Sequence, residues 1–254
     1  MPRYREFSGR VVALTGATQG IGATTAQAFA DQGASVALLY HDEAGAQRIV
    51  AKISDRGGRA LAVRIDVMEE FSVNSALLYV VAEFGKLDIL VNCVGGYGAV
   101  NTVEMISTEE WDHTVALNVR SVFLTCRAAI PALKKSKAGR IINITSISGR
   151  TVHGPSSPAY AAAKAGVVQL TRYLAYELGS YGITSNAIAP YTTLTPRIEA
   201  LRSKQDLKRL VAKVPLGRLA TCDDNAQAIL FLASEAAGYI NGVVLDVNGG
   251  SMMM

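Results

Sequence analysis

The residues TGATQGIG, at positions 15–22, set the topology that we expect for the whole chain. They follow a short apolar run (11–15) and open a segment with helical spacing, so they connect a buried strand to a helix. Glycines at such a turn let the backbone approach a pyrophosphate at the N-terminus of the helix. The spacing Gly16-x3-Gly20-x-Gly22 differs from the common G-x-G-x-x-G pattern, and a tight turn without a ligand is the alternative interpretation.

Beyond this turn, apolar β-branched runs alternate with longer segments of helical spacing. This pattern is typical of repeated βαβ units around a buried parallel sheet. Strands are expected at 11–15, 35–40, 60–66, 88–92, 140–145, 184–189 and 243–247. Helices are expected at about 20–32, 43–56, 69–84, 109–136, 158–181, 197–213 and 223–234. Because no Pro/Ser/Gly-rich linker or internal repeat divides the chain, the sequence predicts one α/β domain.

Composition excludes several classes of protein. The chain has 254 residues, of which 50% are hydrophobic, and this is enough for one large core. The apolar runs are interrupted well before the ~20 residues that a membrane span needs, and the basic, polar start does not resemble a secretory signal. The net charge of +4 is spread along the chain, without the dense basic tracts of nucleic-acid binders. The sequence therefore predicts a cytoplasmic protein without a membrane or nucleic-acid partner.

Cysteine and histidine are not arranged for a metal. The cysteines lack a Cys-x-x-Cys pairing and lie in or beside apolar segments, which favours buried thiols over disulfides. The histidines show no ligand spacing, so no metal site is expected. These residues are Cys93, Cys126, Cys222, His41, His113 and His153.

A second stretch, PAYAAAK (158–164), places a tyrosine and a lysine four residues apart. On a helix, Tyr160 and Lys164 share one face. An ammonium beside the phenol would stabilise the phenolate and lower its pKa from about 10, which makes tyrosine a usable acid or base. By itself, the pair also fits an ordinary helix surface.

The chain resembles the short-chain dehydrogenase/reductase family over about residues 10–250, in its short single-domain branch. The ordered motifs that carry the resemblance are TGATQGIG (15–22), NCVGG (92–96), LNV (117–119), ITSISG (144–149) and YAAAK (160–164). The resemblance implies a single-domain Rossmann fold, with a seven-stranded parallel sheet and helices on both faces. It also implies a nicotinamide cofactor and hydride transfer at a small-molecule carbonyl or alcohol.

By this resemblance, four residues form the catalytic set. Tyr160 exchanges a proton with the substrate, Ser146 orients the substrate oxygen, and Lys164 binds the nicotinamide ribose. Asn118 bends the long helix and holds a water that leads from the lysine. Two alternatives stay open: Asn118 as a plain surface asparagine, and Ser148 in place of Ser146, although a serine that only caps the turn suits Ser148 better.

The resemblance also implies the cofactor contacts. They come from the glycine turn, from the loops after the next strands and from the segment after the sixth strand. The residues are Gly16, Thr18, Gln19, Gly20, Ile21, Gly22, Tyr40, His41, Asp66, Val67, Asn92, Gly95, Tyr160, Lys164, Pro190, Thr193 and Thr195.

The choice between NADP(H) and NAD(H) depends on the end of the second strand. An acidic residue there would accept hydrogen bonds from the ribose of NAD and repel the extra phosphate of NADP. This position is Tyr40, followed by His41, and both His41 and Gln19 could donate to a phosphate. The sequence thus favours NADP(H), whereas Asp42, one position further, favours NAD(H).

Residues 191–215 correspond to the variable substrate lid of the family. Tyr191 replaces a usual glycine, and its ring either turns outward or narrows the substrate site. From 195 to 213, six basic residues stand against two acidic ones, which is typical of a solvated helix face and could also attract an acidic substrate or an acyl carrier. A 3-oxoacyl-thioester (acyl-carrier-protein) reductase is therefore the second hypothesis, and Tyr181, where such reductases often have arginine, argues against it.

A third hypothesis is a sensor or scaffold that binds the nicotinamide without turnover. Such a protein needs the glycine turn but no proton donor, so the presence of all four catalytic residues favours an enzyme. The C-terminal segment resembles the last strand of the family, with Asn248 where aspartate is common. That region commonly lies in a subunit interface, and the resemblance implies a homotetramer.

Overall fold

The computed structural model describes residues 4–136, 138–152 and 156–253, and their strands form one parallel sheet. The strand order is β3-β2-β1-β4-β5-β6-β7, so the order reverses between β1 and β4. In open α/β sheets, ligands bind at such a reversal, outside the carboxyl ends of the strands. The strands are β1 (Val11–Thr15), β2 (Ser35–Tyr40), β3 (Arg59–Arg64), β4 (Ile89–Asn92), β5 (Arg140–Ile144), β6 (Thr184–Pro190) and β7 (Val244–Val247).

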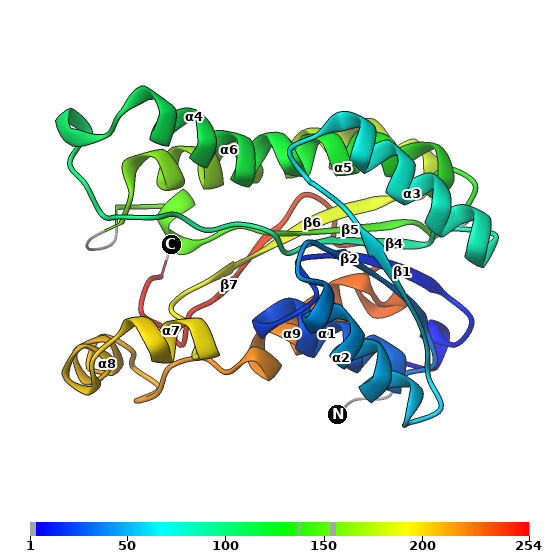
Figure 1. Ribbon diagram of the computed structural model, residues 1–254, viewed down its shortest axis with the longest axis horizontal. Coiled ribbons are helices and arrows are strands. Elements are labelled where there is room, and N and C mark those ends of the chain that lie inside the picture. Colours follow the sequence, from blue (N-terminus) through cyan, green and yellow to red (C-terminus); the bar gives the residue numbers. More distant parts are fainter. Residues whose placement is uncertain (1–3, 137, 153–155, 254) are drawn as a thin grey trace.

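Helices cover both faces of this sheet. In Figure 1, α3, α4, α5 and α6 lie above it, α1, α2 and α9 lie below it, and α7 and α8 lie at one end of the molecule. Their bounds are α1 (Gly20–Asp31), α2 (Glu43–Ser54), α3 (Glu70–Phe84), α4 (Thr108–Val115), α5 (Ser121–Leu133), α6 (Pro158–Leu178), α7 (Pro196–Leu201), α8 (Lys204–Val211) and α9 (Cys222–Ala233). The architecture confirms the single-domain Rossmann fold.

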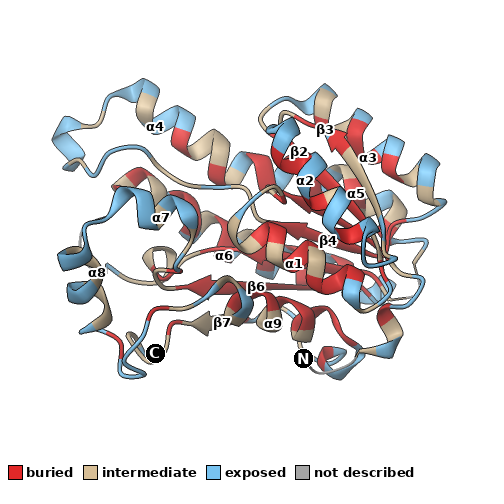
Figure 2. Ribbon diagram, turned by 60° about the horizontal axis from the view of Figure 1, so that its bottom comes forward, coloured by how far each residue is buried: buried red, intermediate tan, exposed pale blue. Residues whose placement is uncertain are grey.

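One hydrophobic core lies between the sheet and each of its two helix layers. Successive side chains of β1 alternate between them: Leu14 packs with Phe29 in one core, and Ala13 packs with Val80 in the other. Figure 2 shows the buried strands between the partly exposed helices. Burial on both faces explains why the strands are continuous apolar runs rather than alternating ones.

The structure confirms the seven strands and corrects two helices. The segment expected as one helix at 197–213 is two helices, because Arg202 is extended and Ser203 starts a new helix by accepting a hydrogen bond from the Asp206 amide at 3.1 Å. The helix expected at 109–136 contains a π-helical turn, Ala116–Arg120, between α4 and α5. Both interruptions lie next to the candidate site.

The helical stretch Thr108–Leu133 is long and apolar enough, by length and composition, to cross a membrane, which the apolar runs of the sequence did not indicate. Within this stretch, α5 packs against α3 and against strands of the sheet. Core helices of soluble proteins meet the same criteria, so the stretch is weak evidence for a membrane span.

Candidate active site

The glycine turn between β1 and α1 has a backbone that other residues would rarely adopt. Gly16 and Gly20 have φ angles of 63° and 55°, in the left-handed region. A β-carbon on Gly22 would collide with the carbonyl oxygen of Gly16. A β-carbon on Gly20 would lie 3.3 Å from Cγ2 of Thr195, so the segment after β6 lies beside this turn. The glycines are therefore required by the turn itself, which packs closely on its own backbone and on the segment after β6.

The residues after β2 bear on cofactor choice. Tyr40 is the last residue of β2 and is buried, whereas His41 is exposed. The carboxylate of Asp42 accepts a hydrogen bond from the Gly45 amide at 3.2 Å and caps α2. The group that argued for NAD(H) is thus engaged by its own helix. Thr18 of the glycine turn packs close to this cap, because a β-carbon on Gly45 would lie 2.8 Å from its Cβ.

Asp66 and Val67 follow β3 and form the next part of this rim. The carboxylate of Asp66 accepts a hydrogen bond from the Met68 amide at 2.9 Å, which fixes the turn after the strand. The side chain of Val67 is buried, so its main chain is the part available to a ligand. Neither residue lines the cavity that contains Tyr160.

Asn92 supports the site from beneath rather than facing it. Its side chain is 2% exposed. It donates to Oδ1 of Asn143 at 2.9 Å and accepts from the Thr125 hydroxyl at 2.7 Å. These bonds join β4, β5 and α5, so the Asn92 side chain holds these three elements together.

Asn118 lies in the π-helical turn and is fully buried, which excludes the surface-asparagine alternative. Its Nδ2 donates to the carbonyls of Gly96 and Thr114 at 2.7 and 2.8 Å, and its Oδ1 accepts from the Gly96 amide at 2.9 Å. Both amide hydrogens are therefore used by the protein. A water beside Lys164 would have to donate to the second lone pair of Oδ1 or bind to main-chain atoms of this turn.

Lys164 lies at the base of the site, 2% exposed, and donates from Nζ to the carbonyl of Ile144 at 2.7 Å. Desolvation lowers the pKa of Lys164 to about 8. The Nζ atom is 5.7 Å from the ring centroid of Tyr160. Since an ammonium forms three hydrogen bonds, two remain for a ligand.

Tyr160 is more weakly acidic than the sequence suggested. Ser157 caps the start of α6, accepting from the Tyr160 amide at 3.5 Å, so the phenol projects from the first turn. Desolvation raises the pKa of Tyr160 to about 12, although a hydrogen bond with Ser146 acts in the opposite direction. The expectation that Lys164 lowers this pKa is wrong for the protein alone, because desolvation is the larger effect.

Ser146, not Ser148, is the residue that caps the turn after β5. Its Oγ accepts a hydrogen bond from the Ser148 amide at 3.1 Å and starts a single 3₁₀ turn, Ile147–Gly149. The same hydroxyl lies near the Tyr160 phenol and acts to lower its pKa. A β-carbon on Gly149 would lie 2.6 Å from the carbonyl carbon of Lys164, so this turn packs directly on α6. The close packing fixes the distance between the serine and the tyrosine.

One cavity of about 350 Å³ brings many of these residues together. It opens at the carboxyl ends of β4, β5 and β6, next to the reversal of strand order. The expected site residues that line it are Ile21, Gly95, Ser146, Tyr160, Lys164, Pro190, Thr193 and Thr195. Those that do not line it are Asn118, in the π-helical turn, and residues of the glycine turn and of the ends of β2, β3 and β4.

Two lining residues, Tyr97 and Cys93, were missed by the sequence analysis. The ring of Tyr97 is tilted against that of Tyr160, with centroids 4.8 Å apart. Desolvation raises the pKa of Cys93 to about 12, which keeps its thiol protonated. Both follow β4, and the only signal in the sequence was their place in the NCVGG segment and directly after it.

Tyr191 and Thr193 occupy the start of the lid. Tyr191 is half-buried and lines the cavity, so its side chain is part of the site wall. Thr193 is buried and its hydroxyl accepts from the Asn225 side chain at 3.0 Å. Thr195 accepts from the Ile198 amide at 3.2 Å and caps α7. These bonds fix the segment that faces the glycine turn.

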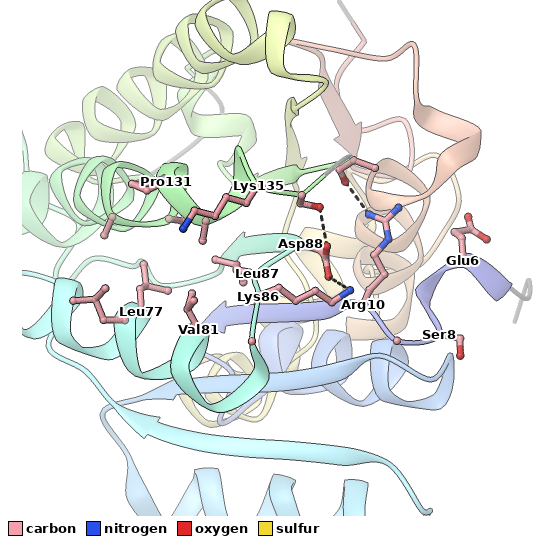
Figure 3. A pocket seen from close by; sticks show the side chains of 18 residues that line it. Glu6, Ser8, Arg10, Leu77, Val81, Lys86, Leu87, Asp88, Pro131 and Lys135 are labelled. Carbon is pink, nitrogen blue, oxygen red and sulfur yellow. Dashed lines mark hydrogen bonds and ion pairs between the residues drawn. The ribbon is translucent and has the colours of Figure 1, made fainter.

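A larger cavity, of about 570 Å³, lies between α3 and α5 at the amino ends of β1 and β4 (Figure 3). Its Asp88 accepts from the Val11 amide at 2.9 Å and from the Ser136 hydroxyl at 2.7 Å, and it pairs with Lys86 at 3.1 Å. Arg10 donates to the carbonyl of Ala138 at 2.8 Å. These groups hold the amino ends of the strands together, and none of the expected site residues lines this cavity.

Within the ranges that the structure describes, no group of three or more His, Cys, Asp or Glu side chains is arranged to hold a metal ion. His153 lies outside these ranges. The cysteines are free thiols; Cys126 is buried, and Cys93 and Cys222 are half-buried.

Comparisons with known proteins match almost the whole chain. A family model described as enoyl-(acyl carrier protein) reductase matches residues 16–252. The 3-oxoacyl-[acyl-carrier-protein] reductase FabG of Escherichia coli is 38% identical over 248 residues, covering 98% of this chain and 99% of the relative. The BbsD subunit of the (2S)-[(R)-hydroxy(phenyl)methyl]succinyl-CoA dehydrogenase of Thauera aromatica is 38% identical over 244 residues, covering 96% and 97%.

Among solved structures, the short-chain dehydrogenase/reductase from Serratia marcescens superposes with a TM-score of 0.90 at 30% identity. The superposition covers 96% of this chain and 98% of that structure. The similarity thus extends over the complete fold, including the lid segment.

Proposed function

We propose, from the premise that this chain belongs to the short-chain dehydrogenase/reductase family of NAD(P)-dependent oxidoreductases, that Tyr160 exchanges the proton in the reaction. The observation that supports this role is that Tyr160, Ser146 and Lys164 line one cavity at the carboxyl ends of the strands. A nicotinamide dinucleotide, when bound, supplies or accepts the hydride. The glycine turn would hold its pyrophosphate, because Gly16 and Gly20 have no side chain to cover the main chain at the start of α1.

The three polar side chains act on the substrate oxygen and on the ribose. The Ser146 hydroxyl and the Tyr160 phenol donate hydrogen bonds to the oxygen as negative charge develops on it. With its pKa raised to about 12, Tyr160 is protonated at neutral pH and gives its proton to the oxygen in reduction. Lys164 keeps two donors for the ribose hydroxyls. In the oxidation of an alcohol, the same proton moves in the opposite direction.

The proposal is tested with purified protein, a panel of ketones, aldehydes and alcohols, and both cofactors, followed by nicotinamide absorbance. Tyr160→Phe should lower kcat about 10³-fold or more, because it removes the general acid, and should leave cofactor affinity within about twofold. If Tyr160→Phe left kcat unchanged, Tyr160 would not be the general acid; if the unmodified protein bound the cofactor but turned over no probe, it would be a sensor or scaffold instead.

We further propose NADP(H) as the preferred cofactor. Tyr40 takes the place of the acidic residue that NAD-specific sites need, and the Asp42 carboxylate is bonded to the Gly45 amide. His41 is exposed beside them and can donate to a phosphate. A kcat/KM at least about tenfold higher with NADPH than with NADH would support this choice; the reverse ratio would contradict it.

A 3-oxoacyl-thioester reductase is the second candidate function. Two of the relatives have names that specify acyl-carrier-protein or CoA thioesters. Reduction of acetoacetyl-CoA with a kcat/KM far above that for simple ketones would favour it.

Three broader features complete the proposal. Residues 191–215, with α7 and α8, form a substrate lid whose helices are largely exposed (Figure 2). The protein works in the cytoplasm on a small molecule and assembles as a homotetramer, as the family resemblance implies. Sedimentation of the purified protein tests the assembly, and a monomer at micromolar concentration would contradict it.

A further inference from the structure

The cavity around Tyr160 has charged lining residues of one sign only. They are Lys164 at its base and Arg202 and Lys213 on the lid side. No carboxylate from the described part of the chain lines it. Lys164 already donates to the Ile144 carbonyl and faces the proposed ribose position. The two lid cations need a separate explanation.

Three other cations of the lid do not line this cavity. Arg209 pairs with Asp206 at 3.7 Å, and Arg197 donates to the carbonyl of Tyr97 at 3.3 Å. Lys208 is exposed on α8 and does not line the cavity. A solvated helix face explains Lys208 and Arg209, whereas the charge of Arg197 lies near enough to Tyr160 to act downward on its pKa. Such a face does not explain why two of the lid cations line the cavity that contains Tyr160.

Hydrogen bonds hold the main chains of Arg202 and Lys213 in place, and their side chains are available to bind a ligand. The Arg202 amide donates to the Ile198 carbonyl at 3.0 Å, and the Lys213 amide donates to the Leu210 carbonyl at 3.1 Å. Buried Val214 anchors the chain directly after Lys213. Among the described residues, neither cation forms a hydrogen bond or close ion pair through its side chain, although the Arg202 charge contributes to lowering the pKa of Asp206.

An apolar wall lies next to these cations. Ile198 of α7 and Leu210 of α8 line the same cavity and are half-buried. The two side chains therefore form an apolar surface, and one cation follows each helix: Arg202 after α7 and Lys213 after α8. Such a surface suits a ligand with a carbon skeleton and an anionic group, because a charged acceptor strengthens the hydrogen bond from a cation.

We infer that the substrate carries a carboxylate or phosphate group, which Arg202 and Lys213 bind while its carbonyl faces Tyr160 and Ser146. This inference rests on the proposed function and specifies its substrate class. The two cations act on binding and not on the proton, so their effect falls on KM.

Matched pairs of probes test this with the NADPH-loaded protein. The carboxylate pair is 4-oxopentanoate and its methyl ester; the phosphate pair is acetoacetyl-CoA and acetoacetyl-N-acetylcysteamine. Arg202→Gln and Lys213→Gln should each raise KM for the anionic member of one pair about five- to tenfold, with kcat within about twofold. KM for the neutral member should not change. Lys208→Gln, the control, removes an exposed cation of α8 that does not line the cavity and should leave all constants unchanged.

Two results would overturn the inference. One is an equal KM for the charged and neutral members in the unmodified protein and in both variants. The other is a rise in KM for NADPH that matches the rise for the anionic probe, because the cations would then bind the cofactor. Failure of the proposed function is distinct, since it means no turnover of any probe. In that case, calorimetric binding of 4-oxopentanoate and its ester decides, and equal affinities contradict the inference.

Discussion

Asn118 holds Gly96 at both its amide and its carbonyl. The Gly96 amide donates to Oδ1 of Asn118 at 2.9 Å, and Nδ2 of Asn118 donates to the Gly96 carbonyl at 2.7 Å. The pair thus fixes the loop after β4 to the π-helical turn between α4 and α5. Because Gly95, Tyr97 and Cys93 on this loop line the cavity, a helix that does not itself line the cavity sets the position of one of its walls.

Asn118→Ala should therefore lower both stability and activity. It leaves the polar groups of Gly96 and the Thr114 carbonyl without their partner, and each buried unsatisfied group costs about 1–3 kcal/mol. We expect the free energy of unfolding to fall by about 2–4 kcal/mol and kcat at least about tenfold. Denaturant unfolding and steady-state kinetics measure the two effects. Asn101→Ala is the control, since Asn101 bonds only to Glu110, at 3.3 Å; equal losses in both variants would contradict the assignment.

Gly95→Ala should damage the site more than Gly98→Ala. A β-carbon on Gly95 would lie 2.7 Å from Oδ1 of Asn118 and 2.8 Å from Nζ of Lys164, whereas one on Gly98 meets nothing within 4 Å. The first substitution must displace a catalytic group, because buried Asn118 has no room to move. We expect kcat/KM to fall at least about tenfold for Gly95→Ala and to stay within about twofold for Gly98→Ala. Comparable kinetics for the two variants would show that the loop adapts freely.

The strands and the dinucleotide turn were predictable because their signals are local. A β-branched run such as VVALT is buried on both faces wherever helices cover a parallel sheet. The break between α7 and α8 also had a local signal, because Ser203 and Asp206 have capping spacing. It was missed because the helical pattern continues on both sides of Arg202.

The electrostatics of the site depended on contacts between distant parts of the chain. The pKa of Tyr160 is set by burial and by Ser146 and Tyr97, which come from other loops. The role of Asn92 depends in the same way on Asn143 of another strand. Spacing in the sequence identified these residues without revealing their partners.

Lys164 should destabilise the folded protein at neutral pH. Its pKa falls from 10.5 in the unfolded chain to about 8 in the folded one. Between these values the unfolded chain binds more protons, so stability rises as the pH rises through this range, and below about 8 the whole cost is present. At pH 7 we expect the free energy of unfolding of Lys164→Met to be about 1–3 kcal/mol higher than that of the original protein, a value that already subtracts the lost hydrogen bond to Ile144. The rise in stability between pH 8 and 10.5 that this group causes should be absent from the variant.

Denaturant unfolding at pH 7 and pH 9.5 measures this difference. Lys134→Met serves as the control, because Lys134 is exposed and lies over the Tyr181 ring. A Lys164→Met protein that is less stable than the original at pH 7 would show that the ammonium stabilises the fold.

Asp42 should affect helix stability and not cofactor choice. Its carboxylate caps α2 through the Gly45 amide. Asp42→Ser keeps a capping oxygen, whereas Asp42→Ala removes it and should cost about 1 kcal/mol of unfolding free energy. In both variants we expect the ratio of kcat/KM for NADPH and NADH to stay within about twofold. A shift of tenfold or more toward NADPH in both would mean that Asp42 contacts the ribose.

Tyr191 should restrict which substrates enter. It lines the cavity of about 350 Å³ that also contains Tyr160 and Ser146. Tyr191→Gly removes a large ring from the wall, so bulkier ketones gain room while small ones lose an apolar contact. We expect kcat/KM for a bulky ketone relative to a small one to rise at least about tenfold, which corresponds to ~1.4 kcal/mol of changed discrimination. Tyr191→Phe, which keeps the ring, should retain the original preference; an unchanged ratio in Tyr191→Gly would place the ring outside the path of the substrate.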